Sequence, residues 1–174
     1  MKAGYIKLLW ISALVLFAIC WMLPILDGGK ETYIGYDGAE LAHTEFWKLV
    51  TGARDDRVSI IGAVFISLGW LANELFLLGL LAAWQWPQSA HRIFAVSLGI
   101  MLSWQILFHE NFPLLIGYWC WIASAVIALS LSVTAEARRT GRSHAQILAD
   151  PVALIGFGVP IVNAVAGVVT GDFK

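Results

Sequence analysis

The stretch "SLGWLANELFLLGLLAAW" at residues 67–84 decides the fold class of this chain. It continues an apolar run that begins at Val58, and only Asn73 and Glu74 interrupt it. A helix of about 20 apolar residues, rising 1.5 Å per residue, crosses the hydrocarbon core of a bilayer. The run therefore predicts a membrane-spanning helix. Glu74 then places a carboxyl group at a depth where lipid is expected.

The rest of the chain has the same apolar character. Of its 174 residues, 59% are hydrophobic and 13% are charged, a balance typical of integral membrane proteins. The net charge is -1, and no cluster of Lys and Arg is interleaved with aromatic residues. This composition predicts the lipid bilayer as a partner and argues against nucleic acid.

Five apolar runs are bounded by charged residues, Pro or Gly. They predict an all-α polytopic membrane bundle of about five transmembrane helices, built as a single integral membrane domain over residues 1–174. The last run contains "GFGVP", whose two glycines and Pro160 predict a kinked or re-entrant segment. The predicted spans are residues 8–26, 58–84, 93–108, 114–133 and 152–169.

The distribution of basic residues predicts a cytoplasmic N-terminus. With that orientation, residues 27–57 form an outer loop that is rich in acidic side chains. Within it, Asp37 can cap a short helix over residues 38–50, and Gly52 supplies a stop. We expect this helix to lie in the outer interface with Phe46 and Trp47 in the headgroup region, or to pack as a cap over the bundle. The residues assigned to the cytoplasmic side are Lys2, Lys7, Arg92, Arg138, Arg139 and Arg142.

Two stripes of small residues recur at four-residue spacing and predict close helix packing. Only "HENFP" joins the third and fourth spans, so these two helices are expected to be antiparallel neighbours with their stripes facing each other. The alternative is that a stripe receives a helix of a partner protein. The stripes are Ala95, Gly99 and Ser103 in the third span, and Cys120, Ser124 and Ala128 in the fourth.

The depth of Glu74 predicts an intramembrane polar cluster. A bare carboxylate in hydrocarbon costs several kcal/mol, so we expect Glu74 to be neutral and turned into the bundle. Counting along the helices puts Ser103 and Ser124 at a similar level, with Asn73 and Gln105 near enough to join them. A structural role is favoured over a proton relay, because no second ionisable residue lies within a predicted span.

Signatures of catalysis, metal binding or cofactor binding are missing from the sequence. The four histidines do not pair at one depth, as a membrane haem requires, and no serine has a histidine at its level. We therefore predict a protein that is not an enzyme and has no metal site and no cofactor. Cys20 and Cys120 share a depth, and free thiols are favoured there, with a disulfide as the alternative.

Short motifs add a resemblance. The stretches "WLAN" at residues 70–73, "LP" at 23–24 and "GYWCWIAS" at 117–124 together resemble a group of small bacterial multi-pass membrane proteins. In that group a proline follows the Asn, where this chain has Glu74. The resemblance implies a multi-pass protein of the bacterial inner membrane and transfers no functional residues.

Three functions fit these observations. The first is a non-enzymatic accessory or structural subunit that packs against a larger membrane complex, or against further copies of itself. The second is a proton- or ion-coupled transporter or channel that uses Glu74. The third is a membrane immunity or regulatory protein, for which the acidic outer loop is the contact surface.

Overall fold

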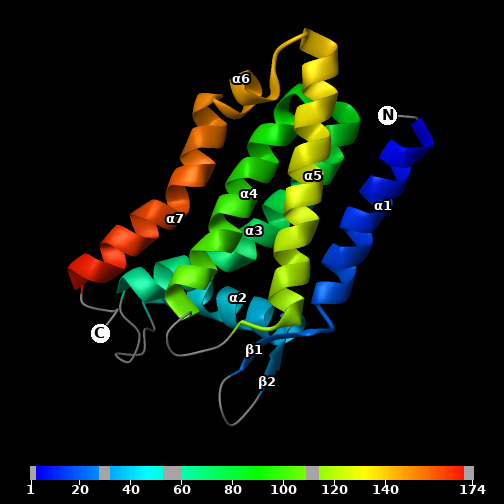
Figure 1. Ribbon diagram of the computed structural model, residues 1–174. Coiled ribbons are helices and arrows are strands. Elements are labelled where there is room, and N and C mark those ends of the chain that lie inside the picture. Colours follow the sequence, from blue (N-terminus) through cyan, green and yellow to red (C-terminus); the bar gives the residue numbers. More distant parts are fainter. Residues whose placement is uncertain (1–2, 28–31, 53–59, 109–113, 171–174) are drawn as a thin grey trace.

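The computed structural model describes residues 3–27, 32–52, 60–108 and 114–170. Five long helices run side by side in alternating directions, so that the described chain starts at one end of the bundle and finishes at the other (Figure 1). Each of the five predicted apolar segments forms one of them, and the all-α prediction is confirmed for the described part. They are α1 (Ala3–Cys20), α3 (Ile60–Gln85), α4 (Pro87–Phe108), α5 (Ile116–Thr140) and α7 (Pro151–Thr170).

The predicted helix in the loop between the first two spans is present as α2 (Gly35–Thr51). It begins three residues before the predicted start, so the prediction that Asp37 caps it is wrong: Ile34 is the N-cap residue. The helix ends at Gly52, whose φ of 73° is favourable only for a residue without a side chain. Asp37 lies in the first turn and accepts a hydrogen bond from the backbone N–H of Ile34 at 3.0 Å. α2 lies across the end of the bundle and packs on α3 (Figure 1).

The first helix is shorter than predicted, and a small hairpin follows it. α1 ends at Cys20, and strands β1 (Pro24–Asp27) and β2 (Thr32–Ile34) pair antiparallel. Pro24 accounts for the difference, because proline has no N–H and forces the residue before it out of the helical region. The hairpin also reaches the start of α5, where the N–H of Leu115 donates to the carbonyl of Ile25 at 2.9 Å.

Helix α4 occupies the centre of the packing and contacts α3, α5 and α7. Its closest approach is to α7, because a Cβ atom at Gly99 would overlap the carbonyl oxygen of Gly156. A Cβ atom at Gly156 would in turn meet the carbonyl oxygen of Ala95 at 2.5 Å. The prediction that the stripe containing Ala95 and Gly99 faces the fourth span is therefore wrong, because this stripe packs against the fifth.

The fourth and fifth predicted spans form α5 and α7, and their places in the bundle are clear. α5 neighbours α4 as predicted, with Ser124 and Ala128 fully buried and Cys120 half-buried. α7 is one helix that contains Pro160, bends along its length and runs to the far end of the bundle without turning back (Figure 1). The kinked alternative fits this shape, and the re-entrant one does not.

Within the described residues, two helical segments are long and apolar enough to cross a membrane. They are Ile66–Gln85 in α3 and Ile116–Thr140 in α5. Two shorter apolar helical segments, Lys7–Cys20 and Pro151–Val165, lie in α1 and α7. A short helix, α6 (His144–Leu148), connects α5 to α7 at the end of the bundle opposite α2 (Figure 1).

Candidate functional site

The middle of α3 turns its two polar residues to opposite sides. Successive residues of an α-helix point about 100° apart, so one member of a polar pair can face inward while the other faces outward. Asn73 is 8% exposed and lies inside the bundle, whereas Glu74 is exposed on its outer surface. The two polar residues that interrupt the apolar run therefore have different surroundings.

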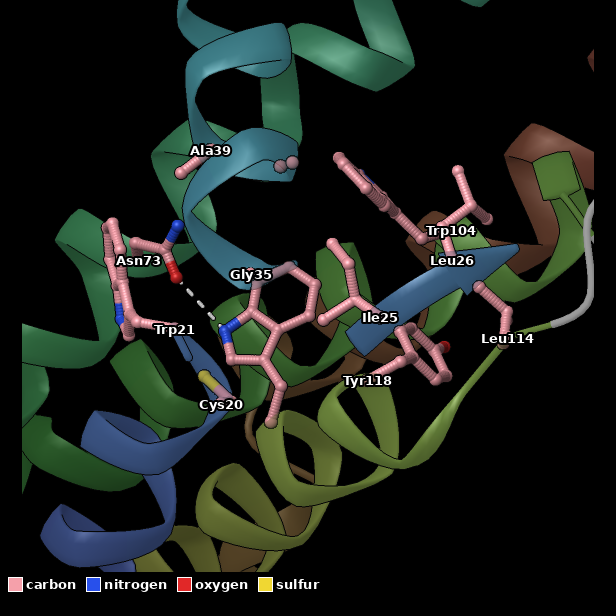
Figure 2. Close-up of a pocket in the computed structure, with 13 residues that line it drawn as sticks. Cys20, Trp21, Ile25, Leu26, Gly35, Ala39, Asn73, Trp104, Leu114 and Tyr118 are labelled. Atoms are coloured by element: carbon pink, nitrogen blue, oxygen red, sulfur yellow. Dashed lines mark hydrogen bonds between the residues drawn. The ribbon is translucent and has the colours of Figure 1, made fainter. Parts of the chain in front are cut away.

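Asn73 joins α3 to α5 through a buried hydrogen bond. Its Oδ1 accepts from the indole Nε1 of Trp121 at 3.0 Å (Figure 2). The Trp121 ring packs edge-on against Trp104 of α4, with the ring centroids 5.9 Å apart. Tyr118, one turn before Trp121, donates its hydroxyl to the backbone carbonyl of Met101 at 3.1 Å. These contacts fix the relative positions of three helices at the α2 end of the bundle.

A cavity of about 30 Å³ lies beside this hydrogen bond. Its walls come from the end of α1, the hairpin, α2, α3, α4 and α5, and apart from Asn73 they are mostly apolar or aromatic (Figure 2). A water molecule needs at least about 10–15 Å³ of such volume, whereas ligand pockets hold several hundred. The cavity therefore suits one or two water molecules. Residues around it include Cys20, Trp21, Ile25, Trp104, Tyr118 and Trp121.

Glu74 belongs to an apolar outer surface of α3. Three- and four-residue spacing along a helix brings side chains onto one face. On this face the leucines around Glu74 are all between 41% and 48% exposed, and the carboxyl group is the one polar element among them. We call this surface the Glu74 face. It consists of Leu71, Glu74, Leu77, Leu78 and Leu81.

The predicted polar cluster does not form. Glu74 points away from the bundle, and the two serines satisfy their hydroxyls within their own helices. Ser103 donates to the carbonyl of Ile100 and Ser124 to that of Trp121, each at 2.6 Å. Asn73 is the one predicted member that makes a buried contact between helices through its side chain, and Gln105 is half-buried.

Asn163 is a polar residue that the sequence interpretation missed. It is 1% exposed in α7, and its Nδ2 donates to the backbone carbonyl of Ser103 at 2.8 Å. This contact lies one turn beyond Gly99 in α4 and about two turns beyond Gly156 in α7, and it adds a hydrogen bond to the α4–α7 interface. An Asn within the apolar fifth segment was the available signal, because such a residue needs a buried partner.

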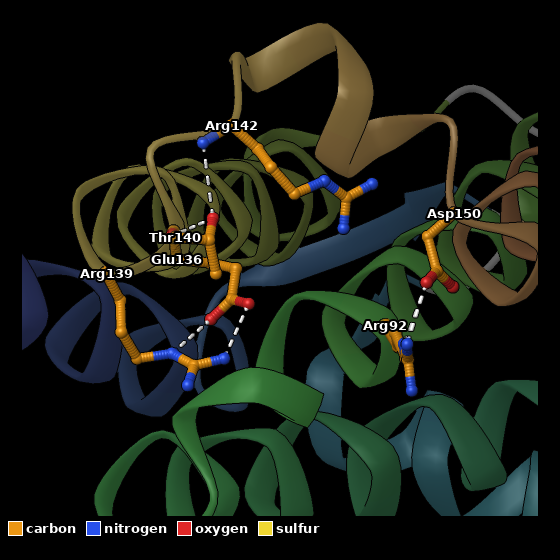
Figure 3. Close-up of polar contacts among 6 residues, drawn as sticks. All are labelled: Arg92, Glu136, Arg139, Thr140, Arg142 and Asp150. Atoms are coloured by element: carbon orange, nitrogen blue, oxygen red, sulfur yellow. Dashed lines mark hydrogen bonds and ion pairs between the residues drawn. The ribbon is translucent and has the colours of Figure 1, made fainter.

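The opposite end of the bundle carries a charged cluster (Figure 3). Arg92 of α4 donates through Nε and Nη2 to Asp150 at 3.1 and 2.8 Å, which connects α4 to the start of α7. Arg139 forms a two-pronged contact with Glu136 of α5 at 2.9 and 2.8 Å. Asp150 also accepts from the backbone N–H of Val152 at 3.0 Å and so caps α7.

His91 lies 4% exposed within this charged end, and its Nδ1 has no hydrogen-bond partner among the described residues. Burial lowers the pKa of His91, because the charged imidazolium loses water. The Asp150 and Glu136 carboxylates act in the opposite direction, while Arg92 and Arg142 add to the lowering. His91 therefore favours its neutral form in the folded protein.

The cysteines and the possible metal ligands are the other reactive groups of the described chain. Cys20 and Cys120 are free thiols, and Cys20 contacts the carbonyl oxygen of Phe17 at 2.8 Å. In the ranges that the structure describes, His, Cys, Asp and Glu side chains do not gather in groups of three or more that could hold a metal ion. Comparison with protein families, curated proteins and solved structures finds no match to this chain.

Proposed function

We propose that this protein is a non-enzymatic integral membrane protein that acts as an accessory or structural subunit of a larger membrane complex. In this proposal the five long helices all span the bilayer, the N-terminus is cytoplasmic and α2 lies at the outer interface. Two of the helices already have the length and apolar character that spanning requires. A bacterial inner-membrane location rests on the resemblance carried by "WLAN" and "GYWCWIAS".

The observation that carries the proposal is the exposure of Glu74 on an apolar face. In an isolated bundle this carboxyl group would lie against lipid, where an ionisable side chain costs several kcal/mol. The adjacent Asn73 does not carry that cost, because its side chain accepts a hydrogen bond from Trp121 inside the bundle. A protein surface that covers the Glu74 face would remove the cost for Glu74 in the same way.

Topology supports this assignment through the two ends of the bundle. α6 and the Arg92, Arg139 and Arg142 side chains lie at one end, and α2 lies at the other (Figure 1). In the sequence, this orientation assigns six Lys and Arg residues to the cytoplasmic side and five to the outer side, a difference of one in the direction that cytoplasmic loops show. Phe46 and the half-buried Trp70 pack together with ring centroids 5.4 Å apart, which holds α2 against α3 at the outer level.

The transporter alternative gains no support from the position of Glu74. An ionisable residue that passes ions or protons is expected to face the bundle interior or a water-filled cavity. Glu74 faces outward, and the cavity beside Asn73 has room for only one or two water molecules. Within the described part of the acidic outer loop, the contacts are with the bundle itself and none favours an immunity protein.

Purification from native membranes in a mild detergent tests the proposal. We expect a stoichiometric protein partner with the wild type and its loss with Leu78→Trp, which places a bulky ring on the Glu74 face. Ile161→Trp is the matched control, because Ile161 is 67% exposed on the outer surface of α7. A protein that purifies alone and conducts ions in proteoliposomes would instead support the transporter alternative.

A further inference from the structure

The chemistry of the Glu74 face indicates what kind of partner covers it, an inference that rests on the proposed function. Glu74 has no hydrogen bond or ion pair among the described residues. The charged pairs that do occur there, Lys48 with Glu45, Arg92 with Asp150 and Arg139 with Glu136, lie on α2 or at the α6 end. Glu74 is therefore a carboxyl group whose partner has to come from outside this bundle.

The depth of Glu74 sets the level at which that partner must act. Ten residues separate Glu74 from the exposed Trp84 near the end of α3, which corresponds to about 15 Å. In the other direction, Trp70 lies one turn away, roughly 6 Å, and contacts His43 of α2 with ring centroids 5.2 Å apart. Glu74 thus lies between two aromatic levels, inside the apolar part of α3.

A second copy of this chain does not supply the matching charge. In a symmetric pair the same surface meets itself, so Glu74 would face another Glu74. Two carboxylates that face each other repel unless they share a proton. The Lys and Arg residues of the described chain lie on α2, about one turn from the level of Glu74, where Lys48 already pairs with Glu45, or toward the α6 end. They are Lys7, Lys48, Arg92, Arg138, Arg139 and Arg142.

We propose that the Glu74 face binds a transmembrane helix of a different protein that carries a lysine or arginine at the depth of Glu74. The leucines around Glu74 provide the apolar contact, and the carboxylate pairs with the basic side chain. Intramembrane charges are commonly paired in this way, because pairing offsets the loss of water on both groups. The two polar residues of α3 then have different roles. Asn73 stabilises the contact between helices within the bundle, and Glu74 determines which partner binds.

Charge exchange tests this inference in the intact complex from native membranes. The partner is identified by mass spectrometry, and its retention is measured for Glu74→Gln and Glu74→Lys. We expect at least a tenfold loss for Glu74→Gln and complete loss for Glu74→Lys. Reversing the basic residue of the partner helix to Glu should restore binding of Glu74→Lys. Glu40→Gln, at an exposed carboxyl group of α2, is the control and should retain the partner.

The outcomes separate this inference from the proposed function. If Leu78→Trp releases the partner but Glu74→Gln retains it fully, the docking face stands and the basic partner residue is wrong. If the Glu74 face cross-links only to a second copy of the chain, a homo-oligomer replaces the different protein. If the wild type has no protein partner, the accessory role itself fails. The melting temperature of each isolated variant, measured in detergent, shows that it is folded.

Discussion

Asn73 and Glu74 are consecutive residues that meet opposite surroundings, and the two sides of α3 differ in the same way. On the inner side, polar groups are bonded and backbones approach closely, as between Asn73 and Trp121. On the outer side, leucines and a carboxyl group are exposed, and the carboxyl group has no hydrogen bond or ion pair within the described chain. The inner side accounts for the stability of the bundle, and the outer side accounts for its proposed partner.

The largest effect should come from filling the closest inner contact. Gly99→Ala puts a methyl group into the backbone of Gly156, where no flexible side chain can move away. We expect a loss of about 3 kcal/mol in the free energy of unfolding, or failure to fold, because overpacking forces the helices apart. Thermal unfolding in detergent is the measurement.

Gly158→Ala is the matched control for that substitution. Gly158 lies in the same helix as Gly156, and a Cβ atom there meets nothing within 4 Å. Because glycine disfavours a helix interior, alanine should be neutral or stabilise by up to about 1 kcal/mol. Equal destabilisation by the two alanines would mean that α4 and α7 do not approach at Gly99.

A smaller effect is expected from the polar pair of α3. Asn73→Leu removes the acceptor of the Trp121 indole N–H and leaves a buried donor unbonded, which costs about 1–3 kcal/mol. Glu74→Leu, in the isolated protein, should change stability by less than about 0.5 kcal/mol, as outer substitutions usually do. Both variants are compared by thermal unfolding in the same detergent. A large loss for Glu74→Leu alone would reverse the assignment of the two sides.

The smallest effect concerns pH and the charged end. The pKa of His91 is lowered from 6.5 in the fold, so the neutral form is stabilised. This contribution is complete above pH 6.5 and is lost as the pH falls through 6.5 toward the lowered value. We expect the melting temperature to fall between pH 7.5 and 5.5, and to fall less in His91→Gln. An identical pH dependence in both proteins would show that His91 is not the responsible group.

The sequence was sufficient to predict the five long helices and α2, but not their orientation. The apolar runs predict all five long helices, and Gly52 predicts the end of α2. The helical position of Glu74 was predictable, yet its direction was not, because α3 is apolar on every side and has no polar face to mark the outside. In the same way, four-residue spacing identified Gly99 as a contact residue without telling which neighbour it meets.

Contacts between distant segments explain the remaining differences. The hairpin that follows α1 is joined to the start of α5 by the hydrogen bond between Leu115 and Ile25, which lie 90 positions apart in the sequence. Asn163 donates a hydrogen bond to the backbone carbonyl of Ser103 in another helix, and Arg92 forms an ion pair with Asp150 at the α6 end. Such pairs form only once the helices have packed, so the local sequence does not predict them.

Site-specific photo-crosslinking in native membranes tests the central claim most directly. A photoreactive phenylalanine analogue at Leu78 reports what covers the Glu74 face, and the same analogue at Ile161 reports the outer surface of α7. We expect a single crosslinked adduct with a different membrane protein from position 78, and lipid adducts from position 161. Lipid adducts alone from position 78 would contradict the claim that a partner protein covers the Glu74 face.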